Sequence, residues 1–405
     1  ASDVYKRQVY VPLVRILFLY KFLNMFSRAI LAVYLIIFSL CSYSQCLSGD
    51  CTNGFGKYKY KNEDLYEGYF KNSYANGKGK MLYSGGEVYD GDWVNGLWLG
   101  KGKYFWKDGR RYEGEVKDGY FEGVGIFYST DSSRYEGNWT VGKYDGQGKY
   151  YFKNGRLYEG NWVKGTKSGK GKFTWTDGGS YDGYWKEDKF DGFGKRIYAD
   201  SSMYEGDWVA DKQDGKGKYI YNNGDIYEGG FKDGKRSGTG KYITKKDGQT
   251  YTGEYAEGQA EGKGKLLLAN KDSYEGDFKK GLAEGYGIGV YADGKKDEGQ
   301  WENGTWEGNG KCTWKDGSSY DGQWLNGKAN GTGTKMYNGG DKYIGEGKDD
   351  KINGEGIYTW KNGDSYTGSF KADVMSGKGK KIYHDGIIYE GDWSNGVYAG
   401  TGILS

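Results

Sequence analysis

The stretch YEGNWVKGTKSGKGKFTWTDGGS, residues 158–180, is followed at once by a second stretch that begins YDGYWKEDKFDGFGKRIYAD at Tyr181. A tyrosine, an acidic residue, a glycine and a tryptophan return at the same places, and so does a Gly-x-Gly pair. With the tyrosine as position 1, the pattern continues in both directions at a spacing of 23 residues, apart from one step of 24. The units begin at Tyr66, Tyr89, Tyr112, Tyr135, Tyr158, Tyr181, Tyr204, Tyr227, Tyr251, Tyr274, Asp297, Tyr320, Tyr343, Tyr366 and Tyr389.

Glycine is the strictest feature of this repeat. Position 3 is glycine in all 15 units. Positions 12 and 14 are glycine in every unit and also in a half unit that precedes them, at Gly54 and Gly56. Position 5 is aromatic in 13 of the 15 units. A fixed period of this length is the signature of a repeat architecture, in which each unit packs only on its neighbours.

The pattern inside one unit predicts a β-hairpin. Positions 1, 3 and 5, and then 14, 16 and 18, hold aromatic residues or glycines that alternate with polar residues, which is the period of a strand. Position 8 is mostly glycine or aspartate, and Asn-Gly or Asp-Gly pairs recur near position 20, so both mark tight turns. The predicted fold is all-β: an elongated single-layer antiparallel β-hairpin solenoid.

Glycines and aromatic residues fall on the same predicted face. A glycine within a strand weakens it unless something needs the space. We therefore expect each ring to lie across the bare backbone of a glycine at position 3, 12 or 14, so that a single layer buries its own face. On the other face, the acid at position 2 and the lysine at position 15 are expected to form exposed, weak cross-strand pairs.

The pattern Tyr-Glu-Gly-x-Trp-x-x-Gly-x-x-x-Gly-x-Gly resembles the MORN repeat (membrane occupation and recognition nexus), and the resemblance covers about residues 54–405. The resemblance implies stacked hairpins with a non-catalytic role: scaffolding, self-association, or attachment to membranes or partners. The residues that match the pattern in full are Tyr158, Glu159, Gly160, Trp162, Gly165, Gly169 and Gly171.

The N-terminal residues precede the repeat. Residues 1–24 include the sequence DVYKRQ, which one reading frame of a common sequencing-library adapter encodes, so we interpret them as a non-native leader before Met25. Residues 25–44 have a basic start, 12 apolar residues and a small-residue cleavage site before Gln45, the pattern of a secretory signal peptide. If this N-terminal region is native and uncleaved, a membrane anchor is the alternative.

A short cysteine-containing segment, residues 45–53, separates the expected cleavage site from the repeats at 54–405. Export permits disulfides, so Cys46 and Cys51 are predicted to pair and to close the N-terminal end. The alternatives are two free thiols or a metal site shared with a partner chain. Cys312 falls at the inward position 16, where a buried small hydrophobe is expected.

No arrangement for catalysis stands out in the sequence. The single histidine, His384, falls in a predicted turn, where a solvated residue is expected. Carboxylates recur at one phase of every unit, whereas acid–base catalysis needs a singular group with a shifted pKa. Glycine strings such as GYGIGV at 285–290 precede strands rather than the helix of a dinucleotide site. We expect no enzyme, no cofactor and no metal.

The aromatic face is the candidate binding surface, and the alternative is that its rings only pack. At position 16, Arg196, Lys335 and Lys381 stand among the rings, where they are expected to make cation–π contacts, to meet an anionic ligand or to extend outward. The units that start at Asp297 and Tyr343 depart from the pattern and are expected to mark a bend or a partner site. The candidate binding residues are Trp139, Trp162, Trp185, Trp208, Tyr158, Tyr181, Tyr204 and Arg196.

Three functions remain open at this point. The first is an exported non-enzymatic scaffold for protein–protein interaction or self-association, in the periplasm, the cell envelope or outside the cell. The second is a module that binds anionic phospholipid surfaces through the position-15 lysines together with the aromatic residues. The third is glycan or cell-wall binding through the aromatic face. The net charge of +3 is nearly neutral and gives no drive towards nucleic acid.

Overall fold

The protein is described by a computed structural model that covers residues 44–405. The chain divides into two compact units, residues 1–199 and 200–405, and the described part of the first begins at Ser44. The predicted leader at 1–24 and signal peptide at 25–44 therefore lie outside the described residues, apart from Ser44. Within residues 44–405, no helix is long and apolar enough to cross a membrane.

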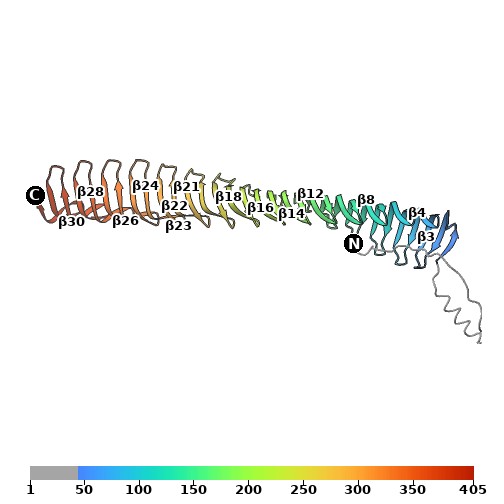
Figure 1. The fold of residues 1–405 in the computed structure, drawn as a ribbon. Coiled ribbons are helices and arrows are strands. Elements are labelled where there is room, and N and C mark those ends of the chain that lie inside the picture. Colours follow the sequence, from blue (N-terminus) through green and yellow to red (C-terminus); the bar gives the residue numbers. More distant parts are fainter. Residues whose placement is uncertain (1–43) are drawn as a thin grey trace, which may run out of the picture. The chain divides into compact units, whose positions relative to one another are not determined.

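The first unit is a single layer of antiparallel strands, each paired with the next along the chain (Figure 1). Its strands are β1 (Gln45–Gly49), β2 (Phe55–Lys59), β3 (Leu65–Lys71), β4 (Tyr74–Leu82), β5 (Val88–Val94), β6 (Leu97–Phe105), β7 (Arg111–Lys117), β8 (Tyr120–Tyr128), β9 (Arg134–Thr140), β10 (Lys143–Tyr151), β11 (Leu157–Val163), β12 (Thr166–Thr174), β13 (Ser180–Lys186) and β14 (Lys189–Ile197).

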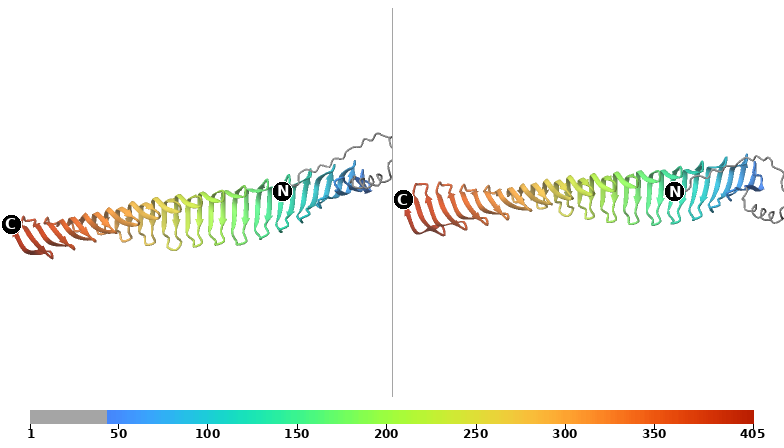
Figure 2. Two further views of the ribbon diagram at one scale, coloured as in Figure 1. Left: turned by 90° about the horizontal axis from the view of Figure 1, so that it is seen from below. Right: turned by 60° about the horizontal axis from the view of Figure 1, so that its bottom comes forward.

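The second unit has the same construction, with its strands side by side in chain order (Figure 2). Its strands are β15 (Met203–Val209), β16 (Lys212–Ile220), β17 (Ile226–Lys232), β18 (Lys235–Ile243), β19 (Thr250–Ala256), β20 (Gln259–Leu267), β21 (Ser273–Lys279), β22 (Leu282–Val290), β23 (Lys296–Glu302), β24 (Thr305–Thr313), β25 (Ser319–Leu325), β26 (Lys328–Met336), β27 (Lys342–Lys348), β28 (Lys351–Thr359), β29 (Ser365–Lys371), β30 (Val374–Ile382), β31 (Ile388–Ser394) and β32 (Val397–Leu404).

Each repeat forms the predicted hairpin. In the repeat at 158–180, β11 and β12 are joined by Lys164 and Gly165, both with positive φ (50° and 94°), as a tight hairpin turn requires. A second turn leads to the next hairpin and is closed by the N–H of Trp175, which donates to the Gly179 carbonyl at 2.9 Å. The turn that follows β18 holds the extra residue of the 24-residue step, in residues 244–249.

Position 12 differs from the expectation. Gly169 has φ of +90° and lies at a bulge, where the register between β11 and β12 shifts. A β-carbon there would lie 3.0 Å from the side-chain nitrogen of Asn161, and no ring is among its nearest neighbours. The glycine at position 12 is therefore required by its backbone conformation, and the expectation that it makes room for a ring of the inner face is wrong.

The N-terminal segment 45–53 is part of the sheet. It contains β1, which pairs with β2, although nothing in the repeat pattern predicts a strand there. A disulfide joins Cys46 to Cys51, with 6.0 Å between their α-carbons. This strand and its disulfide precede the first half unit at Gly54.

Candidate functional site

The inner face of each hairpin is organised by its position-1 tyrosine. Tyr158 lies over the paired glycines Gly160 and Gly171 and donates from its hydroxyl to the Asn161 carbonyl at 2.8 Å. A β-carbon at Gly171 would lie 2.3 Å from the Tyr158 hydroxyl oxygen. The Tyr158 side chain is fully buried, and this burial raises its pKa. Glycines at positions 3 and 14 thus leave the space that the ring occupies, as predicted.

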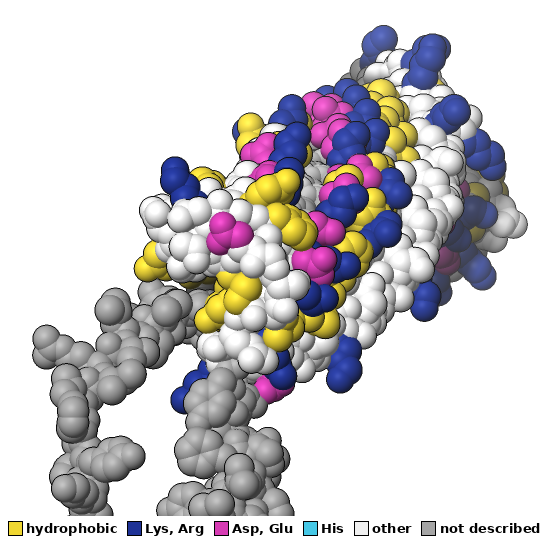
Figure 3. Space-filling view, turned by 90° about the vertical axis from the view of Figure 1, so that its right-hand side faces the viewer, with side chains coloured by type: hydrophobic (Ala, Val, Ile, Leu, Met, Phe, Trp, Pro, Cys, Tyr) yellow, Lys and Arg dark blue, Asp and Glu magenta, His cyan; other side chains and the backbone are white. Residues whose placement is uncertain are grey.

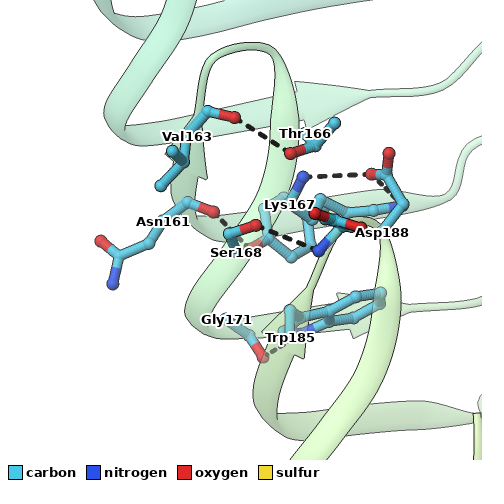
Figure 4. Close-up of polar contacts among 10 residues, drawn as sticks. Asn161, Val163, Thr166, Lys167, Ser168, Gly171, Trp185 and Asp188 are labelled. Carbon is cyan, nitrogen blue, oxygen red and sulfur yellow. Dashed lines mark hydrogen bonds and ion pairs between the residues drawn. The ribbon is translucent and has the colours of Figure 1, made fainter. Parts of the chain in front are cut away.

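The position-5 tryptophan links one hairpin to the previous one. The Trp185 indole N–H donates to the Gly171 carbonyl at 2.9 Å (Figure 4). Its ring also meets Tyr158 edge-on, with 5.2 Å between centres, and Tyr158 meets its own Trp162 in the same way at 5.1 Å. Such edge-to-face pairs each stabilise by about 0.5–1.5 kcal/mol. Rings of successive repeats therefore cover one another without a second layer.

These contacts place the predicted binding rings in the core. None of them is more than 6% exposed. In this structure they pack on glycine backbone and on one another, and the expectation of an open groove lined by these rings is not met. The residues concerned are Trp139, Trp162, Trp185, Trp208, Tyr158, Tyr181 and Tyr204.

The residue type at position 10 differs between repeats and determines which side chain packs on the position-1 tyrosine. Phe190 stacks on Tyr181, with 3.8 Å between ring centres. In the repeat before, the corresponding residue is Lys167, whose ammonium lies 5.0 Å from the Trp185 ring centre and 3.3 Å from Asp188 (Figure 4). Position 10 can therefore carry an aromatic or a charged side chain on the same scaffold.

The cations at position 16 contact rings. The Arg196 guanidinium lies 3.5 Å from the Trp175 ring centre, and half-burial there lowers its pKa. The Lys381 ammonium lies 4.4 Å from the Tyr383 ring centre, and that of Lys335 lies 5.0 Å from that of Tyr337. Of the alternatives for these residues, the structure shows cation–π contacts.

The outer face bears the predicted ion pairs. Lysine at position 15 pairs with the acid at position 2 of the following repeat, as between Lys149 and Glu159 at 2.9 Å, and this hydrogen bond raises the pKa of Lys149. Basic and acidic side chains are interspersed on the face shown in Figure 3, with hydrophobic side chains beside them. Further pairs of this kind include Lys57–Glu67, Lys103–Glu113, Lys265–Glu275 and Lys380–Glu390.

Apolar side chains gather on the outer face at positions 17 and 23, whose residues are direct cross-strand neighbours, and charged residues such as Arg111 and Lys296 interrupt them. We call this set the outer apolar row. Several of its side chains are exposed, among them Leu82 (44%) and Phe105 (39%). Its longest runs are Leu65, Leu82, Val88 and Phe105 in the first unit, and Met203, Ile220, Ile226 and Ile243 in the second.

Comparison with known families agrees with this geometry. The model of the MORN repeat matches 15 stretches that together reach from residue 66 to residue 405. The chain is a MORN-repeat protein. The matched stretches are 66–88, 89–110, 112–134, 135–155, 158–180, 181–203, 204–226, 227–248, 251–273, 274–296, 298–319, 320–342, 343–365, 366–388 and 389–405. MORN repeats are repeat scaffolds for interaction with proteins or membranes.

Solved structures are similar to parts of this MORN-repeat chain. The TCP domain of Drosophila melanogaster SAS-4 in complex with a proline-rich motif of Ana2 is 13% identical, with 47% of this chain and 99% of that chain covered and a TM-score of 0.27. The TCP10 domain of Danio rerio CPAP is 12% identical, with 54% and 92% covered and a TM-score of 0.23. No functional comparison follows at these scores. Among curated proteins, none matches the sequence.

One set of MORN-repeat contacts was missed at the sequence level. The side chain at position 11 accepts a hydrogen bond from the backbone N–H at position 7 of the next repeat, as Glu122 does from Val141 at 2.9 Å. The sequence does indicate these contacts, because position 11 is mostly Asp, Glu, Asn or Ser, whose side chains accept hydrogen bonds. Further acceptors are Asn53 of the half unit, Asp145, Ser168, Asp214, Glu261, Glu284, Glu307 and Asn353.

In the MORN unit that starts at Asp297, a different side chain packs over the paired glycines than in the other units. The indole of Trp306 lies over Gly299 and Gly310, since β-carbons there would come within 3.0 and 2.7 Å of it. Asp297 is buried beneath and pairs with Lys295 at 2.8 Å. Cys312, directly across from it, is fully buried as expected, and burial raises the pKa of its thiol.

His384 contacts a carboxylate in the turn where the sequence placed it. Its Nδ1 lies 2.9 Å from Asp364 Oδ1, and this contact lowers the pKa of Asp364. The His384 side chain is 60% exposed. Within residues 44–405, no group of three or more His, Cys, Asp or Glu side chains is arranged to hold a metal.

Proposed function

We propose that the protein is an exported, non-enzymatic scaffold that binds protein partners, or further copies of itself, along its outer face. The observation that carries this proposal is the outer apolar row. Contiguous exposed apolar surface marks interaction sites. Because each of its longest runs crosses adjacent repeats, a partner that contacts more than one repeat gains avidity without any single strong contact.

Export is supported by two features of the N-terminal region. Residues 25–44 have the pattern of a signal peptide. The disulfide between Cys46 and Cys51 follows directly, and disulfides persist mainly in oxidising compartments. The proposed location is therefore the periplasm, the cell envelope or the outside of the cell.

The outer charges favour a protein partner over an anionic membrane. Several lysines at position 15 pair with acids of the following repeat, and others such as Lys80 and Lys172 lie opposite an acid in the strand register, so the exposed face carries both signs. An anionic lipid surface attracts clusters of unpaired basic residues. Glycan binding would need exposed rings, whereas the predicted rings are buried.

The test uses the full-length secreted protein and a charge variant of the row, Leu82→Glu with Phe105→Glu. Partners captured from the native envelope fraction are quantified by mass spectrometry, and self-association is measured by light scattering. We expect the variant to lose specific partners, or the self-associated species, at least tenfold, since charges at two contact positions oppose burial.

The matched control is Leu97→Glu with Leu99→Glu, two leucines of similar exposure (48% and 39%) that lie outside the row. This control should retain the partners. Equal loss, or equal retention, in both variants would contradict a role for the row. Co-sedimentation of both variants with phosphatidylserine vesicles, but not with phosphatidylcholine vesicles, would instead favour a lipid surface.

A further inference from the structure

A position-1 tyrosine is covered from two directions in this fold. A ring at position 10 of its own repeat stacks on it, as Phe190 does on Tyr181. A ring at position 5 of the next repeat meets its edge, as Trp185 does with Tyr158. Among the described residues, every position-1 tyrosine but one keeps at least one of these covers.

Tyr320 is the exception. Its position-10 residue is Ala329, and position 5 of the next repeat is Gly347. A cavity of about 350 Å³ lies where these two rings are missing, and Trp324, Tyr343 and Tyr320 line it. This volume is at the lower end of the range for small-molecule sites, which runs from about 300 to 1,000 Å³.

The backbone conformation at Gly347 does not require glycine, so the open space is not a by-product of the backbone at this residue. Its φ lies outside the left-handed region, and the nearest atom to a β-carbon there would be the Lys351 carbonyl oxygen, at 3.4 Å. A side chain at 347 therefore fits, as the rings at position 5 of most other repeats do. The missing ring is a local feature of this repeat.

The charged side chains that line the cavity carry a net positive charge. Lys335 lines it and has no ion pair among residues 44–405, while Lys295 is paired with Asp297 at 2.8 Å. The carboxylate of Asp350 is engaged, because it accepts the N–H of Ala329 at 2.8 Å. Lys351 also lines the cavity and has no ion pair among residues 44–405, so two cations are available to a ligand. Of these, Lys335 is the one whose ammonium lies against a ring, 5.0 Å from the centre of Tyr337.

We infer that this cavity binds small aromatic carboxylates, with the ring in the space left by Ala329 and Gly347 and the carboxylate at Lys335. The shape argument is that the corresponding residues are rings in an adjacent repeat, Trp306 in place of Ala329 and Phe370 in place of Gly347, so a flat ring restores the contacts of Tyr320. The charge argument is that an ammonium bordered by aromatic walls selects an anion over a neutral or cationic analogue. This inference goes beyond the scaffold role and does not depend on it.

The experiment titrates the full chain with indole-3-acetate, indole and tryptamine, and follows binding by calorimetry and by ligand-observed NMR. We expect indole-3-acetate to bind at least tenfold more tightly than indole, and tryptamine to bind least, because a charge-assisted contact is lost in both analogues. Absence of binding of indole-3-acetate, or equal affinity for the three probes, would overturn the inference.

Two kinds of variant locate the site. Lys335→Gln should weaken indole-3-acetate about tenfold or more and leave indole unchanged, whereas Lys381→Gln, at the same position of another repeat, should change neither. Gly347→Phe and Ala329→Phe, which fill the cavity from the adjacent strands β27 and β26, should each abolish binding of all three probes. The inference would also be overturned if a folded Gly347→Phe or Ala329→Phe variant still bound the probes. Equal weakening of binding by Lys381→Gln and Lys335→Gln would overturn it as well.

Discussion

The hydroxyl oxygen of Tyr158 lies so close to Gly171 that a β-carbon at residue 171 would come within 2.3 Å of it. A β-carbon on the facing glycine, Gly160, would lie 2.4 Å from the Gly171 α-carbon. Real β-carbons do not approach other atoms so closely, so both glycines are needed for the ring to lie flat on the sheet. This contact recurs in the other repeats that begin with tyrosine, and it is the packing interaction that each of these hairpins shares.

Alanine at these glycines is therefore expected to destabilise the protein. Gly160→Ala or Gly171→Ala should each cost about 1–3 kcal/mol, because the ring or the strand must shift. Gly169→Ala should cost about 1–2 kcal/mol for a different reason, its positive φ. Hydrogen exchange should show faster opening near 158–180 in all three variants. In the first two alone, the near-ultraviolet signal of the tyrosine environment should also change.

Asp297→Tyr is expected to destabilise the protein even though it restores the common residue. The indole of Trp306 already occupies the place of the tyrosine ring, so overpacking should cost about 1–3 kcal/mol. In the double variant Asp297→Tyr with Trp306→Ala, the tyrosine ring can occupy the space over the paired glycines. This double variant should therefore be more stable than either single variant. Denaturant unfolding of the four proteins measures the coupling. Additive effects would show that the two side chains do not share this space.

Val141→Asn is expected to stabilise the protein. Val141 is a β-branched residue at φ of 47°, in the left-handed region that asparagine tolerates better. The gain should be of the order of 1 kcal/mol. Val163, equally exposed at 47% but within strand β11, is the control, and Val163→Asn should lower stability because asparagine is a poor strand former. A loss of stability in both variants would refute the strain at residue 141.

Stability is expected to fall steeply above pH 10. Burial raises the pKa of Tyr227, Tyr251 and Tyr274 to about 12 each, while an unfolded tyrosine ionises near pH 10. The raised pKa adds stability that is fully present below about pH 10 and is lost as the pH rises towards 12, because the unfolded state then binds fewer protons. Absorbance at 295 nm, followed together with circular dichroism, should show ionisation coinciding with unfolding. Ionisation near pH 10 in a folded protein would contradict it.

The hairpins, their turns and the charged pairs could be predicted from sequence because each depends on residues close together in one or two repeats. The alternation around Tyr158 specifies a strand, and Lys149 with Glu159 follows from strand register. The pairing of glycines with rings was also predictable, since glycine within a strand needs a reason.

What could not be predicted depends on contacts between repeats or on backbone angles. The burial of Trp162 and its neighbours arises because rings of successive repeats cover one another, which the alternation in one repeat does not reveal. The bulge at Gly169 depends on φ. The cavity beside Tyr320 requires that Ala329 and Gly347, 18 residues apart, be known as neighbours of one ring.

The contacts that join one hairpin to the next span fixed numbers of residues, 14 from the Trp185 indole to the Gly171 carbonyl and 19 from the Glu187 N–H to Ser168. Deletion or duplication of one whole repeat therefore brings equivalent donors and acceptors together again. A gene for such a chain can lengthen or shorten by entire repeats while the protein still folds. Gain or loss of one codon within a strand is different, because the side chains on one side of the change would turn to the opposite face of the sheet.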